Sequence, residues 1–599
     1  MAWYDEAVFY HIYPLGLTGA PKQNDYGEPV HRLNTLLPWV DHIKEIGGSA
    51  LYIGPLFESV GHGYETTDYK KLDSRLGTNE DLTAFVAYCH EQGIKVIFDG
   101  VFNHTGRDFF AFKDIQANRE NSQYKDWYYN VNFWGNNEYN DGFSYDNWGG
   151  YNLLVKLNQK NPAVVDYICD VIRFWVSEFD VDGIRLDAAD VLDFDFMKAL
   201  RRTANEVKPD FWLMGEVIHG DYSRWVNGET LHSVTNYTLH KALYSGHNDH
   251  NYFEIAHTVR RLQNMGTLKL YNFVDNHDVE RIYTKLTNKA HFAPVHVLLY
   301  TLPGVPSIYY GSEFGIEGRK EYGSDDSLRP ALNIEDYKDS VKTNPCTALI
   351  AALGKVRQAV PALSYGSYDE LMLTNRQFAY ARDLDGTRVI VSVNNDDAPA
   401  GMHLAAGNCT AYIGALSGEK VSVQDGHINI TQPANSGEIW VPDVTDLDVK
   451  PVKVVTKTES EAKTNTEDKA ASETATDAKG NKEAEPKIES KESKDIVTAT
   501  ESADAKKNTT NTEKNISAAN EVKDSAKDAS AQAAADTPVD PETITVDWSK
   551  SPESMTVPEL QAAILAKLAG NGPVDAQMKK TVTDNIWHDS LVNWLKSFR

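Results

Sequence analysis

The sequence predicts an α/β fold followed by a smaller β-rich region, and three observations support this prediction. Apolar strand-like runs alternate with amphipathic helical segments over roughly the first 360 residues. Four of these runs end in carboxylates, His or Arg. From about residue 360 to 445 the pattern changes to short strands separated by turn signals. At 599 residues the chain is too long for one core, so we expect three or more structural units.

The elements of the α/β region follow one another along the chain. The sequence predicts helices over 36–46, 79–92 and 161–179. The second ends at Gly93, a favourable stop signal, and the third begins at Pro162, which suits a first helical turn. Strands are expected at 7–13, 49–54, 94–98, 183–186, 211–215, 234–237, 271–275 and 302–311.

Four strand ends carry chemically useful side chains. They lie in the runs 94–104, 182–187, 211–216 and 271–278. A charged residue at the end of a buried strand is costly unless it is paired, and all four ends are expected to converge on one rim. In the second run Arg185 lies two residues before Asp187, so both project from the same face of the strand, where the cation keeps the carboxylate ionised. The alternative for this run is a purely structural Arg–Asp pair.

Together these runs resemble the α-amylase family of glycoside hydrolases. The resemblance rests on D-x-x-x-N-H at 99–104, G-x-R-x-D at 183–187, G-E at 215–216 and N-H-D at 276–278, and it covers about 3–445. It points to the branch of cyclomaltodextrinases, neopullulanases and maltogenic amylases. It implies a (β/α)8 TIM barrel made of residues 1–104 and 161–358, with a domain B insertion at 105–160 after the third strand.

The resemblance also implies the roles of the site residues. Asp187 would be the nucleophile, Glu216 the general acid/base and Asp278 the stabiliser of the transition state. Retaining cleavage needs such a pair, one carboxylate ionised and one carboxyl protonated, about 5–5.5 Å apart. The remaining residues are expected to bind substrate or to position these groups: His62, Tyr64, Asp99, His104, Arg185, His277, Asp325 and Arg329.

Four of these residues come from two loops. Tyr64 and His62 belong to a run, 62–69, that resembles the family's H-G-Y-x-x-x-D-Y loop, in which the Tyr stacks on a sugar ring. The alternative is a surface loop with a structural Tyr. Asp325 and Arg329 resemble the family's Asp and Arg that grip the sugar, and the alternative there is a surface ion pair.

The insertion at 105–160 is dense in aromatic residues. Long insertions in compact domains are usually functional, and this one follows a barrel strand, so we expect it to overhang the active-site face. About half of its aromatic side chains are expected to pack into a small core of its own.

The C-terminal part of the sequence divides into three stretches. Residues 359–447 predict an antiparallel β-sandwich. Residues 448–545 are rich in Lys, Glu, Ala, Thr, Ser and Asp, a composition that predicts a disordered linker. Residues 546–599 predict a small helical hairpin, which either packs on itself or on the barrel, or docks on a protein partner.

Composition limits the classes of molecule that the protein is expected to bind. The formal net charge of −27 argues against nucleic-acid binding and favours a neutral substrate. The N-terminal residues lack the pattern of a signal peptide, and no run approaches 18 apolar residues. A cytoplasmic protein that binds no membrane is therefore expected. The four cysteines, at 89, 169, 346 and 409, have no metal-site spacing, and those at 89 and 169 are expected as buried thiols in helices.

The resulting interpretation is a retaining hydrolase that cleaves α-1,4-glucosidic bonds of maltooligosaccharides or cyclodextrins through a covalent glycosyl-enzyme. Ala188 follows the nucleophile where α-1,6-preferring relatives usually carry Val, which favours α-1,4 bonds. A transglycosylase or phosphorolytic enzyme would share all three carboxylates. A non-catalytic carbohydrate-binding or scaffold protein would usually have lost some of them. No cofactor is required, but the resemblance leaves calcium open, with Asn103 as a ligand.

Overall fold

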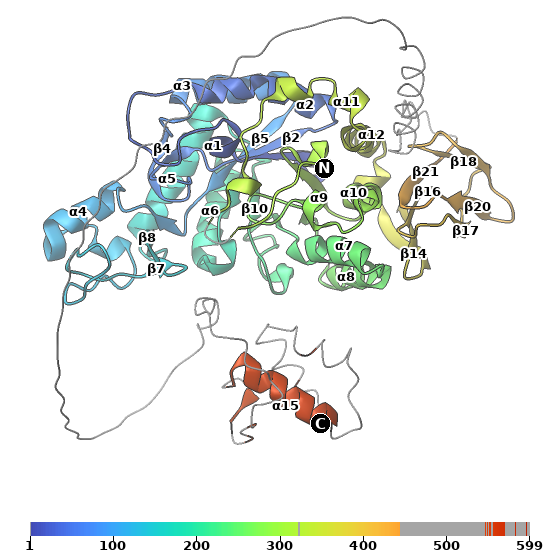
Figure 1. Cartoon of the computed structure of the whole chain (residues 1–599). Helices are drawn as coiled ribbons and strands as arrows, with labels where there is room; N and C mark the ends of the chain where they lie inside the picture. Colours follow the sequence, from blue (N-terminus) through green and yellow to red (C-terminus); the bar gives the residue numbers. More distant parts are fainter. Residues whose placement is uncertain are drawn as a thin grey trace, which may run out of the picture. The chain divides into compact units, whose positions relative to one another are not determined.

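The computed structural model describes residues 2–266, 268–321 and 324–443, and from the C-terminal region 546, 548, 550–552, 555–569, 582 and 595. The chain divides into two compact units, Met1–Thr498 and Ala499–Arg599. The first unit contains a barrel, an insertion and a set of antiparallel sheets (Figure 1).

The centre of the first unit is an eight-stranded parallel sheet that curls into a nearly closed barrel. Its strands, in chain order, are β1 (Phe9–Ile12), β2 (Ala50–Ile53), β5 (Lys95–Gly100), β9 (Gly183–Leu186), β10 (Trp212–Gly215), β11 (Ser233–Val234), β12 (Tyr271–Asn272) and β13 (Val305–Tyr309). The sheet order runs from β11 through β10, β9, β5, β2, β1 and β13 to β12. A bridge between Thr235 and Tyr271 brings the two ends together. The predicted TIM barrel is confirmed.

Helices surround this barrel (Figure 1). They are α2 (Leu37–Glu45), α3 (Asn79–Glu91), α5 (Pro162–Phe179), α6 (Phe194–Val207), α7 (Tyr237–Asn248), α8 (Tyr252–Asn264), α10 (Phe292–Thr301) and α12 (Pro345–Ala359). Local sequence sets their ends: Thr78 and Asp81 form a capping box at the start of α3. Helix α5 begins after Asn161, which caps it, and ends at Asp180 in the left-handed conformation with φ 53°.

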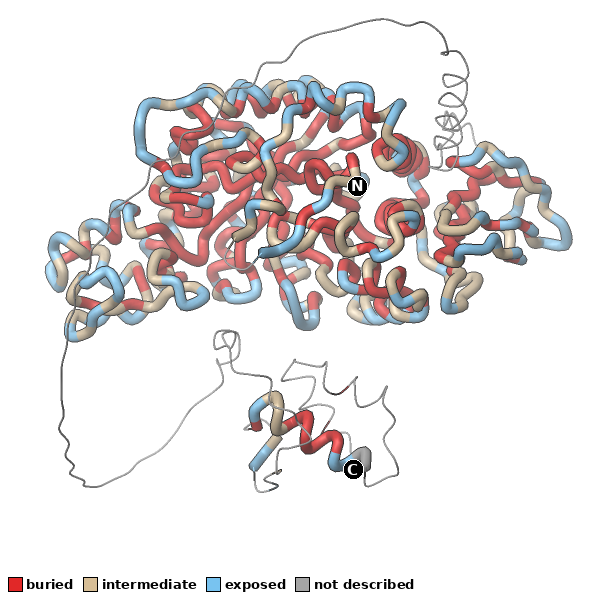
Figure 2. The backbone as a smooth tube through the Cα atoms, in the orientation of Figure 1, coloured by how far each residue is buried: buried red, intermediate tan, exposed pale blue. Residues whose placement is uncertain are grey.

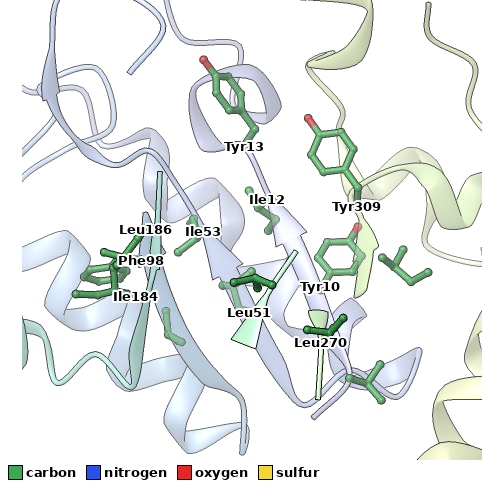
Figure 3. Packing of buried hydrophobic residues seen from close by; sticks show 14 of the residues in the cluster. Tyr10, Ile12, Tyr13, Leu51, Ile53, Phe98, Ile184, Leu186, Leu270 and Tyr309 are labelled. Atoms are coloured by element: carbon green, nitrogen blue, oxygen red, sulfur yellow. The ribbon is translucent and has the colours of Figure 1, made fainter. Parts of the chain in front are cut away.

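Side chains alternate along each strand between the helices and the barrel interior. Tyr10, Ile12, Leu51, Ile53 and Phe98 belong to the large core between strands and helices, part of which is drawn in Figure 3. Their neighbours along the strands form a second cluster inside the barrel, which includes Phe9, Ala50, Tyr52, Ile97, Trp212, Met214, Tyr271 and Val305. Figure 2 shows the consequence, a buried interior under an exposed outer layer.

The insertion after β5 forms a small domain of its own at one side of the barrel (Figure 1). It contains the antiparallel strands β6 (His104–Thr105), β7 (Asn147–Trp148) and β8 (Tyr151–Lys156), and helix α4 (Phe110–Asn118). Its aromatic residues divide as expected. Phe112, Tyr128, Phe143 and Tyr145 are buried, whereas others, Trp134 among them, are exposed. We call residues 105–160 domain B.

Antiparallel sheets follow the barrel, as predicted. One has six strands: β14 (Ser367–Leu373), β15 (Gln377–Leu384), β16 (Thr387–Asn394), β21 (Ser436–Pro442), β18 (Ala411–Gly414) and β19 (Lys420–Ser422). The other pairs β17 (Ala400–Ala405) with β20 (His427–Gln432). Residues of both, including Ile390, Met402, Leu404, Ile428 and Trp440, form one apolar cluster.

In the second unit the structure describes helix α15 (Val557–Ala569), where the first helix of the hairpin is expected. Leu560, Ile564 and Leu565 of this helix cluster with Val582 and Leu595. The predicted linker at 448–545 lies entirely outside the described residues. Most of the second predicted helix lies outside them as well.

The prediction for the sixth strand was only partly right. The structure has a short strand at Ser233–Val234, and Tyr237 begins α7 instead of ending the strand. The Asn236 side chain accepts a hydrogen bond from the Leu239 amide, so it caps a helix at that point. All four cysteines are described, and no disulfide joins them; Cys89 and Cys169 are buried. Among the described helices, none has the length and apolar character to cross a membrane.

A buried arginine connects the C-terminal sheets to the barrel. Arg382 donates hydrogen bonds to the carbonyls of Thr301, at 2.6 Å, and Gly366, at 2.9 Å.

We expect Arg382→Met to lower the free energy of unfolding by about 2–4 kcal/mol, because it leaves buried carbonyls without donors. Arg388→Met, which removes a more exposed ion pair of the same sheet, should cost less than about 1 kcal/mol. Urea unfolding followed by circular dichroism measures both, and equal losses would contradict this account.

Candidate active site

Along the barrel strands, the side chains that face the interior change from apolar to charged toward the carboxyl ends. Ile97 and Met214 face the interior, and the residues two positions further along the same strands are Asp99 and Glu216. In β9 the interior positions are Gly183, then Arg185, then Asp187 just after the strand. The registers of β5 with β9 and of β9 with β10 place Arg185 directly beside Asp99 and Met214. The charged groups therefore meet at the carboxyl ends of the strands.

One guanidinium group joins three of the predicted carboxylates. Arg185 Nη1 lies 2.9 Å from Asp99 Oδ1 and 2.9 Å from Asp187 Oδ1, and Nη2 lies 2.9 Å from Glu216 Oε2. Arg185 and Asp99 are buried, with side chains 4% and 0% exposed, whereas Asp187 and Glu216 remain 11% and 14% exposed. The two predicted catalytic carboxyls thus reach solvent, and the Arg185–Asp99 pair lies beneath them. We call these four residues the carboxylate cluster.

The two oxygens of Glu216 have different partners. Oε2 forms an ion pair with Arg185 Nη2, at 2.9 Å, and accepts a hydrogen bond from the backbone amide of Ala188, at 3.1 Å. Ala188 adopts the left-handed conformation, with φ 46°, at the point where its amide contacts Glu216. Oε1 accepts a weaker hydrogen bond from the Tyr237 hydroxyl, at 3.3 Å. Oε1 is therefore the oxygen better able to carry a proton.

The third predicted carboxylate lies in a separate set of contacts. Asp278 Oδ2 is 3.0 Å from His277 Nε2, and Asp278 Oδ1 accepts a hydrogen bond from Arg329 Nη2 at 2.9 Å. Arg329 also bonds Asp325, at 3.1 Å, and lies over the ring of Tyr13, 4.6 Å from its centroid. The loop residues Asp325 and Arg329 are therefore brought to the NHD motif rather than forming an isolated surface pair.

Tyr64 connects these two sets. Its hydroxyl donates to Asp99 Oδ2 at 3.1 Å and also contacts His277 Nε2. The rings of Tyr64 and His277 are nearly parallel, with centroids 5.7 Å apart. His62 lies beside Tyr64, where its Nε2 contacts Glu65 at 3.3 Å.

Two predicted substrate-binding residues are occupied by protein contacts. Both ring nitrogens of His104 face protein atoms, since Nε2 lies 3.1 Å from the Tyr64 carbonyl and Nδ1 lies 3.2 Å from the Asn103 side-chain amide. Asp99 is bound by Arg185, Tyr64 and the Tyr52 hydroxyl, the last at 2.8 Å. These geometries give both residues a positioning role, and direct contact with sugar stays a prediction for them.

The carboxyl groups differ in their electrostatic surroundings. Burial raises the pKa of Asp187 well above that of an exposed carboxyl; Arg185 opposes this rise, and Glu216 and Asp99 add to it. Burial also acts on Asp278, but His277 and Arg329 outweigh it and lower the pKa of Asp278 well below its ordinary value. Burial therefore favours the protonated form of Asp187, which Arg185 opposes, whereas His277 and Arg329 keep Asp278 ionised.

Two residues of this site are not predicted from the sequence. Tyr237 falls in a predicted strand, but its hydroxyl contacts Glu216 and accepts a hydrogen bond from Asn276 at 3.2 Å. Tyr13 also falls in a predicted strand, but it lies beneath Arg329. Both residues lie just past the carboxyl end of a barrel strand, and that position was the available signal.

The surroundings of Asn103 do not suit calcium. Its side-chain amide contacts His104 and, at 3.5 Å, Gln159. Calcium is bound by six to eight oxygen atoms, among which carboxylates are usual. Across the described part of the chain, no group of three or more His, Cys, Asp or Glu side chains is arranged to hold a metal ion.

Comparison with known proteins agrees with this geometry. The model of the alpha amylase catalytic domain matches residues 32–355. A cyclomaltodextrinase from Bacillus sp is 31% identical over 66% of this chain and 74% of its own length. A cyclomaltodextrinase from Thermoanaerobacter pseudethanolicus is 32% identical over 66% and 71%. A solved structure of a cyclomaltodextrinase superposes with a TM-score of 0.65 at 26% identity, over 73% of this chain and 78% of that one.

Removal of the central cation tests the electrostatics of the cluster. In Arg185→Met the charge that opposes the raised pKa of Asp187 is lost, so that pKa should rise further. A carboxyl whose pKa is higher in the folded state loses stabilisation as pH increases through that pKa. The melting temperature of this variant should therefore fall further below wild type at pH 8 than at pH 5, and Arg185→Lys should show a smaller pH-dependent deficit. A deficit that is independent of pH would contradict this account.

Proposed function

Because the chain belongs to the α-amylase family of glycoside hydrolases, we propose that it cleaves α-1,4-glucosidic bonds of maltooligosaccharides and cyclodextrins with retention of configuration. The observation that carries this proposal is the arrangement of Asp187 and Glu216 on the two Nη atoms of one guanidinium. A single shared cation suits the shorter spacing of about 5–5.5 Å that retaining enzymes use, rather than the longer one of inverting enzymes.

The first step is the attack of Asp187 on the anomeric carbon. Asp187 attacks in its ionised form, which burial disfavours and the Arg185 cation favours; Arg185 also holds Oδ1, which leaves Oδ2 for bond formation. Glu216 donates its proton to the glycosidic oxygen as that bond breaks. The proton belongs on Oε1, because Oε2 is already paired with the Arg185 cation and accepts a hydrogen bond from the Ala188 amide.

The second step reverses the role of Glu216. As a carboxylate it takes a proton from a water molecule, and that water attacks the anomeric carbon of the glycosyl-enzyme. The bond between Asp187 and the sugar breaks, and the released Asp187 carboxylate pairs again with Arg185. Two inversions at one carbon restore the α configuration.

Asp278 completes the site without exchanging a proton. Since His277 and Arg329 lower its pKa, it stays ionised beside the sugar throughout the reaction. A fixed negative charge binds the positively charged, oxocarbenium-like transition state more tightly than the neutral substrate, and this difference accelerates the reaction. The Tyr64 ring, which is nearly parallel to the ring of the buried His277, is the aromatic surface that we expect the sugar to contact.

The stereochemistry of the product tests this mechanism. A proton NMR time course with maltotriose should show the α-anomer of the newly formed reducing end first, followed by slow mutarotation. Initial appearance of the β-anomer would rule out double displacement. Absence of any cleavage of maltotriose, cyclodextrin or pullulan would rule out the proposed substrates.

The active site requires only the first unit. The carboxylate cluster, Asp278 and their contacts lie between residues 13 and 329. We therefore expect a protein that ends at residue 450 to keep kcat/KM on maltotriose within about twofold of the full chain, because the residues that bind and orient the reacting groups are all retained. A loss above tenfold, in a truncated protein with an unchanged circular dichroism spectrum, would mean that the C-terminal region contributes to the site.

A further inference from the structure

Domain B carries a hollow that is separate from the carboxylate cluster. Its volume is about 690 Å³, within the range of about 300–1,000 Å³ usual for small-molecule sites. The lining residues are Glu120, Asn130, Val131, Asn132, Phe133, Trp134, Ser144, Tyr145 and Asp146. All of them belong to domain B, whereas the reacting groups come from the ends of barrel strands. We call this feature the Trp134 hollow.

Trp134 is the most exposed of the large hydrophobic side chains that the structure describes, at 98%. Its backbone nevertheless has a defined position. The Trp134 amide donates to Asn132 Oδ1 at 3.0 Å, and the Gly135 amide donates to the Asn132 carbonyl at 3.1 Å. A Cβ atom at residue 135 would collide with the Ser144 side chain, so glycine allows the turn to approach it. The turn therefore holds an indole in solvent at the edge of the hollow.

The chain beneath this turn is well packed. Asn132 and Ser144 exchange two backbone hydrogen bonds, at 2.8 and 2.9 Å. Phe133 packs on Phe143 with ring centroids 5.7 Å apart. Arg119 lies over both rings and donates hydrogen bonds to two backbone carbonyls of the loop. A binding surface supported in this way loses little conformational entropy when a ligand binds.

The polar lining of the hollow suits a neutral, hydroxyl-rich ligand. Asn130 donates a hydrogen bond to Asp146 Oδ2 at 2.8 Å, and both side chains retain further hydrogen-bonding capacity. Glu120 adds a second carboxylate, so the hollow would repel an anion. Adjacent hydroxyls of a sugar match such amide and carboxylate pairs, and the apolar face of a pyranose ring matches an exposed indole.

We propose that the Trp134 hollow is a second binding site for α-glucan chains, in which Trp134 stacks on a glucose ring and Asn130 and Asp146 bind its hydroxyls. This inference rests on the proposed function, since that function supplies the class of ligand. The site holds long chains on the enzyme without contributing to bond cleavage. Short substrates that occupy only the site around Asp187 and Glu216 gain nothing from it.

The test compares binding of a long glucan with turnover of a short one. Binding is measured by retardation in native gels that contain soluble starch, in the Asp187→Asn background so that the polymer is not consumed. Turnover of maltotriose is measured in the otherwise wild-type chain. Both assays use Trp134→Ala, the conservative Trp134→Tyr, and Tyr151→Ala, a matched control that removes another exposed aromatic of domain B outside the lining.

We expect Trp134→Ala to weaken starch binding by about three- to tenfold, the usual value of one aromatic contact, with kcat/KM on maltotriose within twofold of wild type. Trp134→Tyr should retain most of the binding, and Tyr151→Ala all of it. Unchanged retardation of Trp134→Ala, or an equal loss in Tyr151→Ala, would overturn the inference. A parallel loss of maltotriose turnover in Trp134→Ala would also overturn the inference.

The result is distinguishable from failure of the proposed function. If the wild-type chain cleaves maltotriose but Trp134→Ala binds starch normally, the function stands and the second site does not. If starch binding depends on Trp134 but no α-glucan is cleaved, the second site stands and the proposed activity does not.

Discussion

The burial of one guanidinium among three carboxylates is the constraint on which this structure depends. Arg185 and Asp99 are almost wholly buried, and a buried charge destabilises a protein unless it is paired and hydrogen-bonded. The pairing requires the registers that the sheet has, with Arg185 opposite Asp99 in one neighbouring strand and Met214 in the other. Because one cation faces three carboxyl groups, Arg185 only partly offsets the burial that raises the pKa of Asp187.

The same barrel interior explains why the reacting groups lie where they do. Its lower part is filled by large apolar side chains such as Phe9, Trp212 and Met214, which exclude water from beneath the charges. Two residues further along the strands the side chains are ionisable, and beyond the strand ends they reach solvent. Exposed fractions increase in that order, from 0% for Asp99 through 11% for Asp187 to 34% for Asp278. The barrel therefore combines an apolar interior that excludes water with catalytic groups that are accessible to solvent at the strand ends.

Much of this organisation is predictable from sequence, because it follows from strand periodicity and from residues at strand ends. The barrel, the antiparallel sheets and the meeting of Asp99, Arg185 and Glu216 all follow from such patterns. What could not be predicted depends on contacts between distant parts of the chain or on backbone groups. The amide of Ala188, a residue with a positive φ, contacts Glu216, and Tyr237 contacts Glu216 from the start of a helix where the sequence predicts a strand. The contacts of His104 with other residues of the chain likewise cannot be predicted from a motif.

The central claim is that Asp187 forms a covalent bond to the sugar while Arg185 holds it beside Glu216. A fluorinated α-glucosyl fluoride that forms the glycosyl-enzyme faster than water removes it would trap this state, and mass spectrometry of the digested protein would locate the adduct. The account predicts one fluoroglucosyl group per chain, on the peptide that contains Asp187, and no adduct in Asp187→Asn. An adduct on another carboxylate, or inactivation without any adduct, would contradict it.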